Sequence, residues 1–221
     1  MRFPGRWVGM LVAAVFAVPG LAAQDLAQVC QALTKLTTGQ WASYAISGGG
    51  EDGATLRFAI VGTELHNDST YYWFEAVHTS PADSTKNGII QVLIPGWGTT
   101  ASPRAMVMKL GQRPAMKMPE QALAMAPKAN PGSEMSRRCG TSQSVGWESI
   151  TVPAGTLRAL HVKDVDGDEA WLTPDVPFGL VKGQRPDGGQ MTLTGRGTDA
   201  KSSITETPQE MPMMPGMTGH P

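Results

Sequence analysis

The chain has 221 residues and a formal net charge of −1 at pH 7, and apolar residues make up 41% of it. This length and apolar fraction allow one ordinary hydrophobic core, and the near-neutral charge argues against a nucleic-acid-binding protein. The 26 glycines and 17 prolines indicate many turns, and they favour a mainly β chain over a helical one.

Residues 1–23 have the pattern of a secretory signal peptide. Arg2 and Arg6 make the start positive, residues 8–18 are almost continuously apolar, and small residues follow at 21–23. The apolar run is shorter than the roughly 20 residues that a membrane span needs. Because no cysteine stands at the expected cleavage site, we expect a periplasmic or secreted protein that is soluble after cleavage rather than a lipoprotein.

Residues 25–36 are predicted to form a helix that packs on a sheet, with Asp25 as its N-cap. Its apolar residues recur at the spacing of one helical face. They are Leu26, Val29, Cys30, Leu33 and Leu36.

The chain has two cysteines, Cys30 and Cys139, and in an exported protein we expect them to pair. The disulfide would close a loop of roughly 110 residues, which is worth about 4–5 kcal/mol in the entropic description. Two free thiols are the alternative.

Four short runs between residues 40 and 94 predict an antiparallel meander, because they alternate in polarity or are rich in aromatic residues and are separated by turns. The runs cover residues 40–46, 54–63, 70–79 and 88–94.

Residues 102–131 are rich in methionine and differ from the strands before them. We expect a fifth strand at 105–110, a short helix at 119–126 and a loop at 129–132. Methionine is flexible and polarisable, so it suits adaptable apolar surfaces. We therefore predict a site for a lipid or another apolar ligand here, with ordinary core filling as the alternative. The predicted site residues are Met106, Met108, Met116, Met118, Trp73 and Trp97.

The run from residue 148 to 182 predicts further strands, at 149–152, 156–163 and 169–173. Asp166 and Gly167 favour a tight hairpin turn. A calcium loop through the aspartates at 164, 166 and 168 is the alternative, but the glycine stands in the wrong position and no glutamate follows at position 12.

Strands are also predicted at 190–195 and 201–206, and residues 207–221 are expected to be disordered. The thioethers of this tail suit Cu(I), so copper binding is a hypothesis for it, with a tail that binds no metal as the alternative. The residues concerned are Met211, Met213, Met214, Met217 and His220.

The run from 148 to 182 pairs two strands through a Pro-Ala-Gly-Thr turn, continues into a strand with a tryptophan and ends in Pro-Phe-Gly-Leu-Val-Lys. The residues of this pattern are Glu148, Ile150, Val152, Pro153, Ala154, Gly155, Thr156, Trp171, Pro177, Phe178, Gly179, Leu180, Val181 and Lys182. The pattern resembles exported proteins with the fold of the periplasmic lipoprotein carriers (Lol-type). The resemblance implies a half-open sheet closed by helices around a hydrophobic cavity, and the carriage of an apolar ligand.

Residues 24–206 are thus expected to form one mainly β (α+β) domain, a curved antiparallel sheet of about nine strands with an N-terminal helix on it. No histidine pair or serine motif predicts catalysis, so we expect a non-catalytic binding protein without a cofactor. Besides an apolar ligand and copper, a partner protein of the envelope is the third alternative, through an exposed sheet edge.

Overall fold

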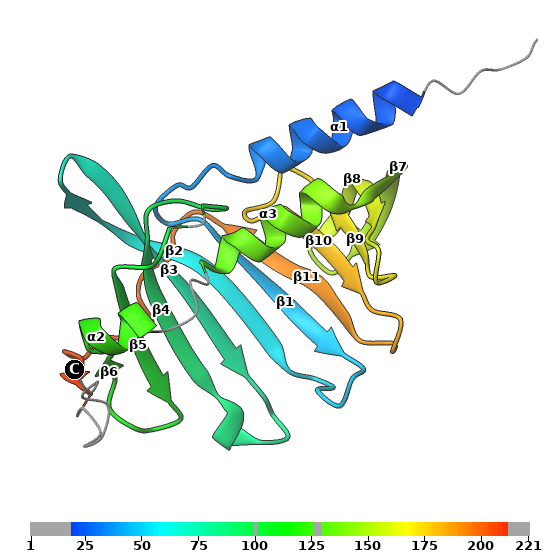
Figure 1. Ribbon diagram of the computed structural model, residues 1–221. Helices are drawn as coiled ribbons and strands as arrows, with labels where there is room; N and C mark the ends of the chain where they lie inside the picture. The colour runs from blue at the N-terminus through cyan, green and yellow to red at the C-terminus, as the bar shows by residue number, and fades with distance from the viewer. Residues whose placement is uncertain (1–18, 100, 126–129, 212–221) are drawn as a thin grey trace, which may run out of the picture.

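The computed structural model describes residues 19–99, 101–125 and 130–211 (Figure 1). Twelve strands form one open, curved sheet in the order β12-β6-β5-β4-β3-β2-β1-β11-β10-β9-β8-β7, and only the β12–β6 pair is parallel. The strands are β1 (Trp41–Ser47), β2 (Thr55–His66), β3 (Ser69–Thr79), β4 (Gly88–Ile94), β5 (Ala105–Leu110), β6 (Met116–Lys117), β7 (Gln143–Val152), β8 (Gly155–Lys163), β9 (Glu169–Leu172), β10 (Leu180–Gln184), β11 (Gln190–Gly197) and β12 (Gln209–Glu210).

The mainly β, antiparallel-dominated fold is as predicted, but the count of nine strands is wrong. The strands β6 and β12 have two residues each, too few to show a period in the sequence. Residues 201–206 do not form the predicted strand. Their polar groups bond to side chains of the sheet instead of to a neighbouring strand, as at Ser203 and Glu75.

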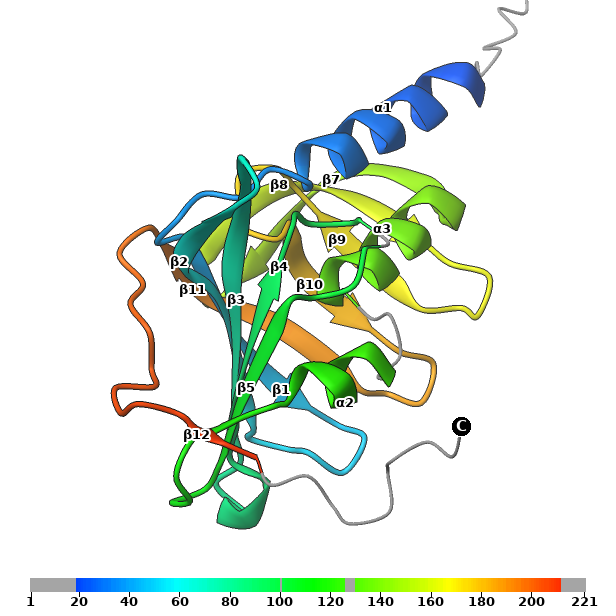
Figure 2. The same cartoon turned by 60° about the vertical axis from the view of Figure 1, so that its left-hand side comes forward.

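Three α-helices lie on one face of the sheet (Figures 1 and 2), which we call the concave face. They are α1 (Pro19–Ala32), α2 (Glu120–Met125) and α3 (Pro131–Thr141), and a 3-10 turn, η1 (Ser84–Lys86), joins β3 to β4. The predicted apolar stripe is buried, as Leu26 and Val29 of α1 and Leu33 just after it show, but the helix ends at Ala32 and does not reach the predicted residue 36. Asp25 is not the N-cap, because the helix begins at Pro19; its carboxylate accepts a hydrogen bond from the Trp147 indole at 2.9 Å instead.

The prediction missed α3, which begins inside the loop expected at residues 129–132. Asn130 caps the helix, and its side-chain oxygen accepts the Gly132 amide at 3.0 Å. Asparagine followed by proline is a common start of a helix, because the cap satisfies a free amide and proline brings none to satisfy.

The core lies between the concave face and the helices α1 and α3. Its centre is a cluster of aromatic rings whose neighbouring centroids lie 5.1 to 5.9 Å apart. Such pairs contribute about 0.5–1.5 kcal/mol each beyond the area that they bury. The cluster consists of Tyr44, Phe58, Phe74, Trp97 and Phe178.

The opposite, convex face is crossed by residues 198–208, here called the C-terminal strap, which lead from β11 to β12 (Figure 2). The buried carboxylate of Glu75 accepts hydrogen bonds from the amide and hydroxyl of Ser203, each at 2.8 Å, and from the Gln91 side chain at 2.8 Å. Further along, Ile204 packs in a small apolar cluster and Glu206 pairs with Lys109. The strap therefore holds its course across the sheet through side-chain contacts.

Candidate functional site

A cavity of about 510 Å³ lies between α3 and the strands β1, β11, β10, β9 and β8 on the concave face. In Figure 1, α3 runs across this part of the sheet. The volume is within the range of about 300–1,000 Å³ that is typical of small-molecule sites.

The floor of the cavity contains one row of residues that the strand register places side by side. Ile46 pairs with Met191, Met191 with Gly183, Gly183 with Ala170, and Ala170 with Val162. All five line the cavity. Gly183 has no side chain and Ala170 has only a methyl group. The row is therefore hollow at these two positions, and space remains between the sheet and α3.

The helix α3 forms the roof and is held to the protein at its N-terminal end by Asn130. The Asn130 side chain is buried, and its amide donates to the Gly96 carbonyl oxygen at 2.7 Å and to the Thr99 hydroxyl at 3.1 Å. A Cβ atom at Gly132 would overlap the ring of Trp97, so only glycine allows the helix to lie this close to the core.

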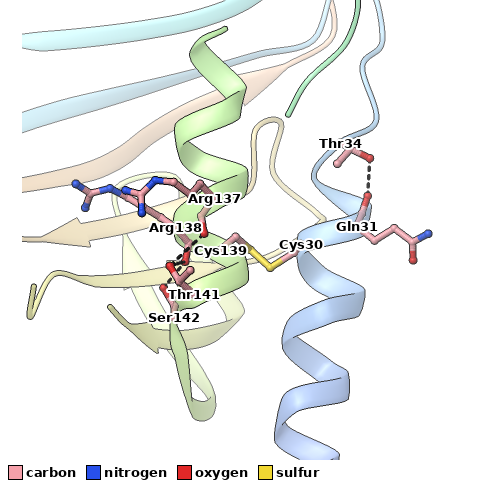
Figure 3. Close-up of a disulfide and its surroundings, with 8 residues drawn as sticks. All are labelled: Cys30, Gln31, Thr34, Arg137, Arg138, Cys139, Thr141 and Ser142. Atoms are coloured by element: carbon pink, nitrogen blue, oxygen red, sulfur yellow. Dashed lines mark hydrogen bonds between the residues drawn. A yellow bond between two sulfur atoms is a disulfide. The ribbon is translucent and has the colours of Figure 1, made fainter. Parts of the chain in front are cut away.

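The C-terminal end of α3 is joined to α1 by a disulfide between Cys139 and Cys30 (Figure 3). The two Cα atoms lie 5.9 Å apart, and the cysteines are 109 residues apart in the sequence. The predicted pairing is confirmed. Cys139 also lines the cavity, so the covalent link is part of the roof.

Arg138 joins the same end of α3 to the turn between β8 and β9. Its guanidinium donates to Asp164 at 3.0 Å, to Asp168 at 2.7 Å and to Glu134 at 2.8 Å. The hydrogen bonds that Arg138 donates to Glu134 and Asp168 raise its pKa. Asp164 also accepts the amides of Asp166 and Asp168, so the hairpin-turn interpretation of these aspartates is confirmed.

The ion pairs within α3 are expected to weaken in acid. Hydrogen bonds from Arg137 and Arg138 lower the pKa of Glu134 from 4.5 to about 2. Because the folded-state pKa is depressed, the stabilisation is present above about pH 4.5 and is lost as the pH falls towards 2. We expect Glu134→Gln to lower the melting temperature at pH 6, and the difference from wild type to close between pH 4.5 and 2.

The measurement is a series of thermal melts of both proteins from pH 7 to 2. Glu120→Gln on α2 removes a carboxylate from an exposed position, and its melting temperature should follow that of wild type at every pH. A difference between Glu134→Gln and wild type that does not change with pH would contradict the assignment.

None of the six residues predicted to bind an apolar ligand lines this cavity. Met106, Met108 and Met116 share the concave face of β5 and β6, and Met106 packs against the main core. Met118 follows β6 and donates its amide to the Met106 carbonyl oxygen at 2.9 Å.

The two predicted tryptophans lie on different faces of the sheet. Trp97 belongs to the aromatic cluster on the concave side. Trp73 packs on the convex side with Ile204 of the strap, and its indole donates to Glu64 at 2.8 Å. The structure therefore does not bring the two tryptophans together.

The predicted copper ligands Met213, Met214, Met217 and His220 lie outside the described residues. Met211 is described: it follows β12 and donates its amide to the Lys117 carbonyl oxygen at 2.9 Å. Within ranges 19–99, 101–125 and 130–211, no cluster of three or more His, Cys, Asp or Glu residues is placed to hold a metal. Copper binding by the tail stays a prediction.

The sequence contained partial signals for the cavity. Alternation along residues 156–163 already places Leu160 and Val162 on one face, and Val162 is a floor residue. Gly183, which follows Leu180 and Val181 after one lysine, is a further hint, since strand glycines often mark a close approach of another group. What the sequence did not indicate is that α3 covers this row.

No protein family matches this chain. A search of curated proteins also found no match. Among solved structures, a chain of the MucA–MucB complex of Pseudomonas aeruginosa is 11% identical, with a TM-score of 0.46, and the match covers 82% of this chain and 58% of that chain.

Two smaller structures share the general arrangement more weakly. A Bacteroides fragilis protein with a YmcC-like fold is 10% identical, with a TM-score of 0.38 and 74% and 98% of the two chains covered. A DUF1329 family protein from Desulfovibrio piger is 13% identical, with a TM-score of 0.33 and 86% and 95% covered. Membership of the Lol-type carriers stays a prediction.

Proposed function

We propose that the protein is an exported, non-catalytic binding protein that holds an apolar ligand under α3. The observation that supports this is the hollow row on the floor of the cavity, where Gly183 and Ala170 leave space between larger apolar residues. A core built only for stability fills such space, because protein interiors pack as densely as organic crystals.

The disulfide supports action outside the cytoplasm, since such bonds persist mainly in oxidising compartments. In the described part of the chain, no helix combines the length and the apolar character that crossing a membrane requires. The site proposed here replaces the methionine-lined one that the sequence predicted, because none of those methionines borders the cavity.

Filling the hollow row is expected to abolish binding. At Gly183 an added Cβ would meet nothing closer than Leu180 at 3.9 Å, and the backbone there is not in the left-handed region. Gly183→Leu should therefore fold while its side chain occupies the ligand's place. We expect at least a roughly tenfold loss of affinity, because overpacking a site costs on the order of 1–3 kcal/mol.

The measurement is the fluorescence of N-phenyl-1-naphthylamine, a neutral apolar probe, titrated with protein. The matched control is Gly62→Leu on β2, where the added Cβ would meet the Trp73 ring at an ordinary 3.8 Å and does not border the cavity. Equal probe binding by Gly183→Leu and wild type would overturn the proposed site.

A further inference from the structure

The charged residues that line the cavity are mostly acidic. Five carboxylates stand against two guanidinium groups, which leaves an excess of three negative charges. The carboxylates belong to Glu51, Glu134, Asp164, Asp168 and Glu169, and the guanidinium groups belong to Arg138 and Arg185.

Both guanidinium groups already have carboxylate partners. Arg138 contacts three carboxylates, and Arg185 lies 2.7 Å from Asp187. Counting the ion-paired neighbours Arg137, Lys163 and Asp187 as well still leaves an excess of two negative charges. Four of the five carboxylates are ion-paired too, and Glu51 is the one that takes part in no ion pair within the described residues. An anionic group entering the cavity would thus meet charges that are already paired and one carboxylate that repels it.

Glu51 lies in the loop between β1 and β2, whereas Glu134, Asp164 and Asp168 bond to Arg138 of α3, and Glu169 pairs with Lys163. Its side chain is exposed at the border of the cavity, beside Gly48 and Gly49. This residue can be changed without touching α3, the disulfide or the turn that Arg138 contacts.

We propose that the ligand is a single-chain amphiphile with a positively charged end group. This inference rests on the proposed function and adds the chemistry of the ligand. The apolar floor of Ile46, Met191 and Val162 receives the chain, while the acidic border receives the cationic end. A cleft lined by one sign of charge concentrates the field inside it and attracts the opposite charge. Fatty acids and other anionic lipids should accordingly bind poorly.

The test compares three amphiphiles with the same twelve-carbon chain, each below its micelle concentration, by displacement of N-phenyl-1-naphthylamine from the full chain. Dodecyltrimethylammonium is the cationic probe, dodecyl maltoside the neutral one and dodecyl sulfate the anionic one. We expect the cation to bind about tenfold more tightly than the anion at low salt, with the neutral probe between them. The preference should shrink as salt is added, because these charges are close to solvent.

Glu51→Lys reverses one charge of the border, and we expect it to lower the affinity for the cationic probe by about three- to tenfold without changing that for the neutral probe. Glu120→Lys on α2 changes the net charge equally but lies away from the cavity, and it should leave all three affinities unchanged.

Equal affinities for the three probes, or tighter binding of the anion, overturn the charge preference while the proposed apolar site stands. If no amphiphile displaces the probe, and Gly183→Leu binds the probe like wild type, the proposed function fails as well.

Discussion

The double variant Cys30→Ser, Cys139→Ser is expected to lose about 4–5 kcal/mol of its free energy of unfolding, because the disulfide closes a loop of more than 100 residues in the unfolded chain. The link joins α3, the roof of the cavity, to α1, whose Leu26 and Val29 lie in the core. We therefore also expect the variant to bind N-phenyl-1-naphthylamine more weakly. Urea unfolding followed by tryptophan fluorescence gives the first quantity.

A reducing agent provides the matched control. Reduced wild type should unfold at the same urea concentration as the variant, and the variant should not respond to reduction. A loss below about 1 kcal/mol would show that the disulfide hardly constrains the unfolded chain, contrary to what its loop length implies.

Replacing Glu75 with alanine should have the second large effect, a loss of about 3–5 kcal/mol, as expected when one partner of a buried charged group is removed. Glu75 is fully buried, accepts three hydrogen bonds and lies 3.6 Å from the Arg57 guanidinium. Its removal takes the acceptor from the amide and hydroxyl of Ser203 and one of two acceptors from the buried Gln91 side chain, and a buried donor that loses its acceptor costs about 1–3 kcal/mol.

The strap is expected to detach before the rest of the sheet in this variant. Lys201 is exposed within the strap, so trypsin should cleave there sooner than in wild type, which mass spectrometry detects. Glu120→Ala is the control, since it removes an exposed carboxylate from α2 on the concave face, opposite the strap. If cleavage at Lys201 is equally fast in wild type and Glu75→Ala, the carboxylate does not hold the strap.

Elements with a clear period could be predicted from the sequence. The burial of β1 alternates along the chain, and β2, β3 and β4 are runs rich in apolar and aromatic residues between turns, so a local pattern was enough. The turn at Asp166 and Gly167 was also predictable, because glycine there has a positive φ of 86°.

The candidate site was harder to predict because it depends on register between strands far apart in the sequence. Ile46 and Met191 become neighbours only when β1 pairs with β11. The space between Met191 and Val162 exists because Gly183 and Ala170 fall into the same row. The sequence of a single strand does not show which residues of other strands share its row. Methionine content was a misleading guide, since Met106 fills core space beside β4 while Met135 and Met191 border the cavity.

The strap could not be predicted for a related reason. Residues 201–206 alternate in a way that is typical of a strand, yet they bond to Glu75 and Gln91 across the convex face. A buried glutamate in the middle of β3 was the one sign in the sequence that a polar segment had to cover this face, since buried carboxylates need hydrogen-bond partners.

Because α3 is secured at both ends, by Asn130 at one and by Cys139 and Arg138 at the other, it has no free end about which to swing open. We expect a ligand to enter and leave past the tips of two hairpins at the border of the cavity, where Gly48 and Gly49 of one lie against Gly188 and Gly189 of the other. These tips are short glycine stretches without bulky side chains. The two hairpin tips would therefore set the rates of ligand association and dissociation. Larger side chains at these tips would lower both rates by the same factor and leave the affinity unchanged.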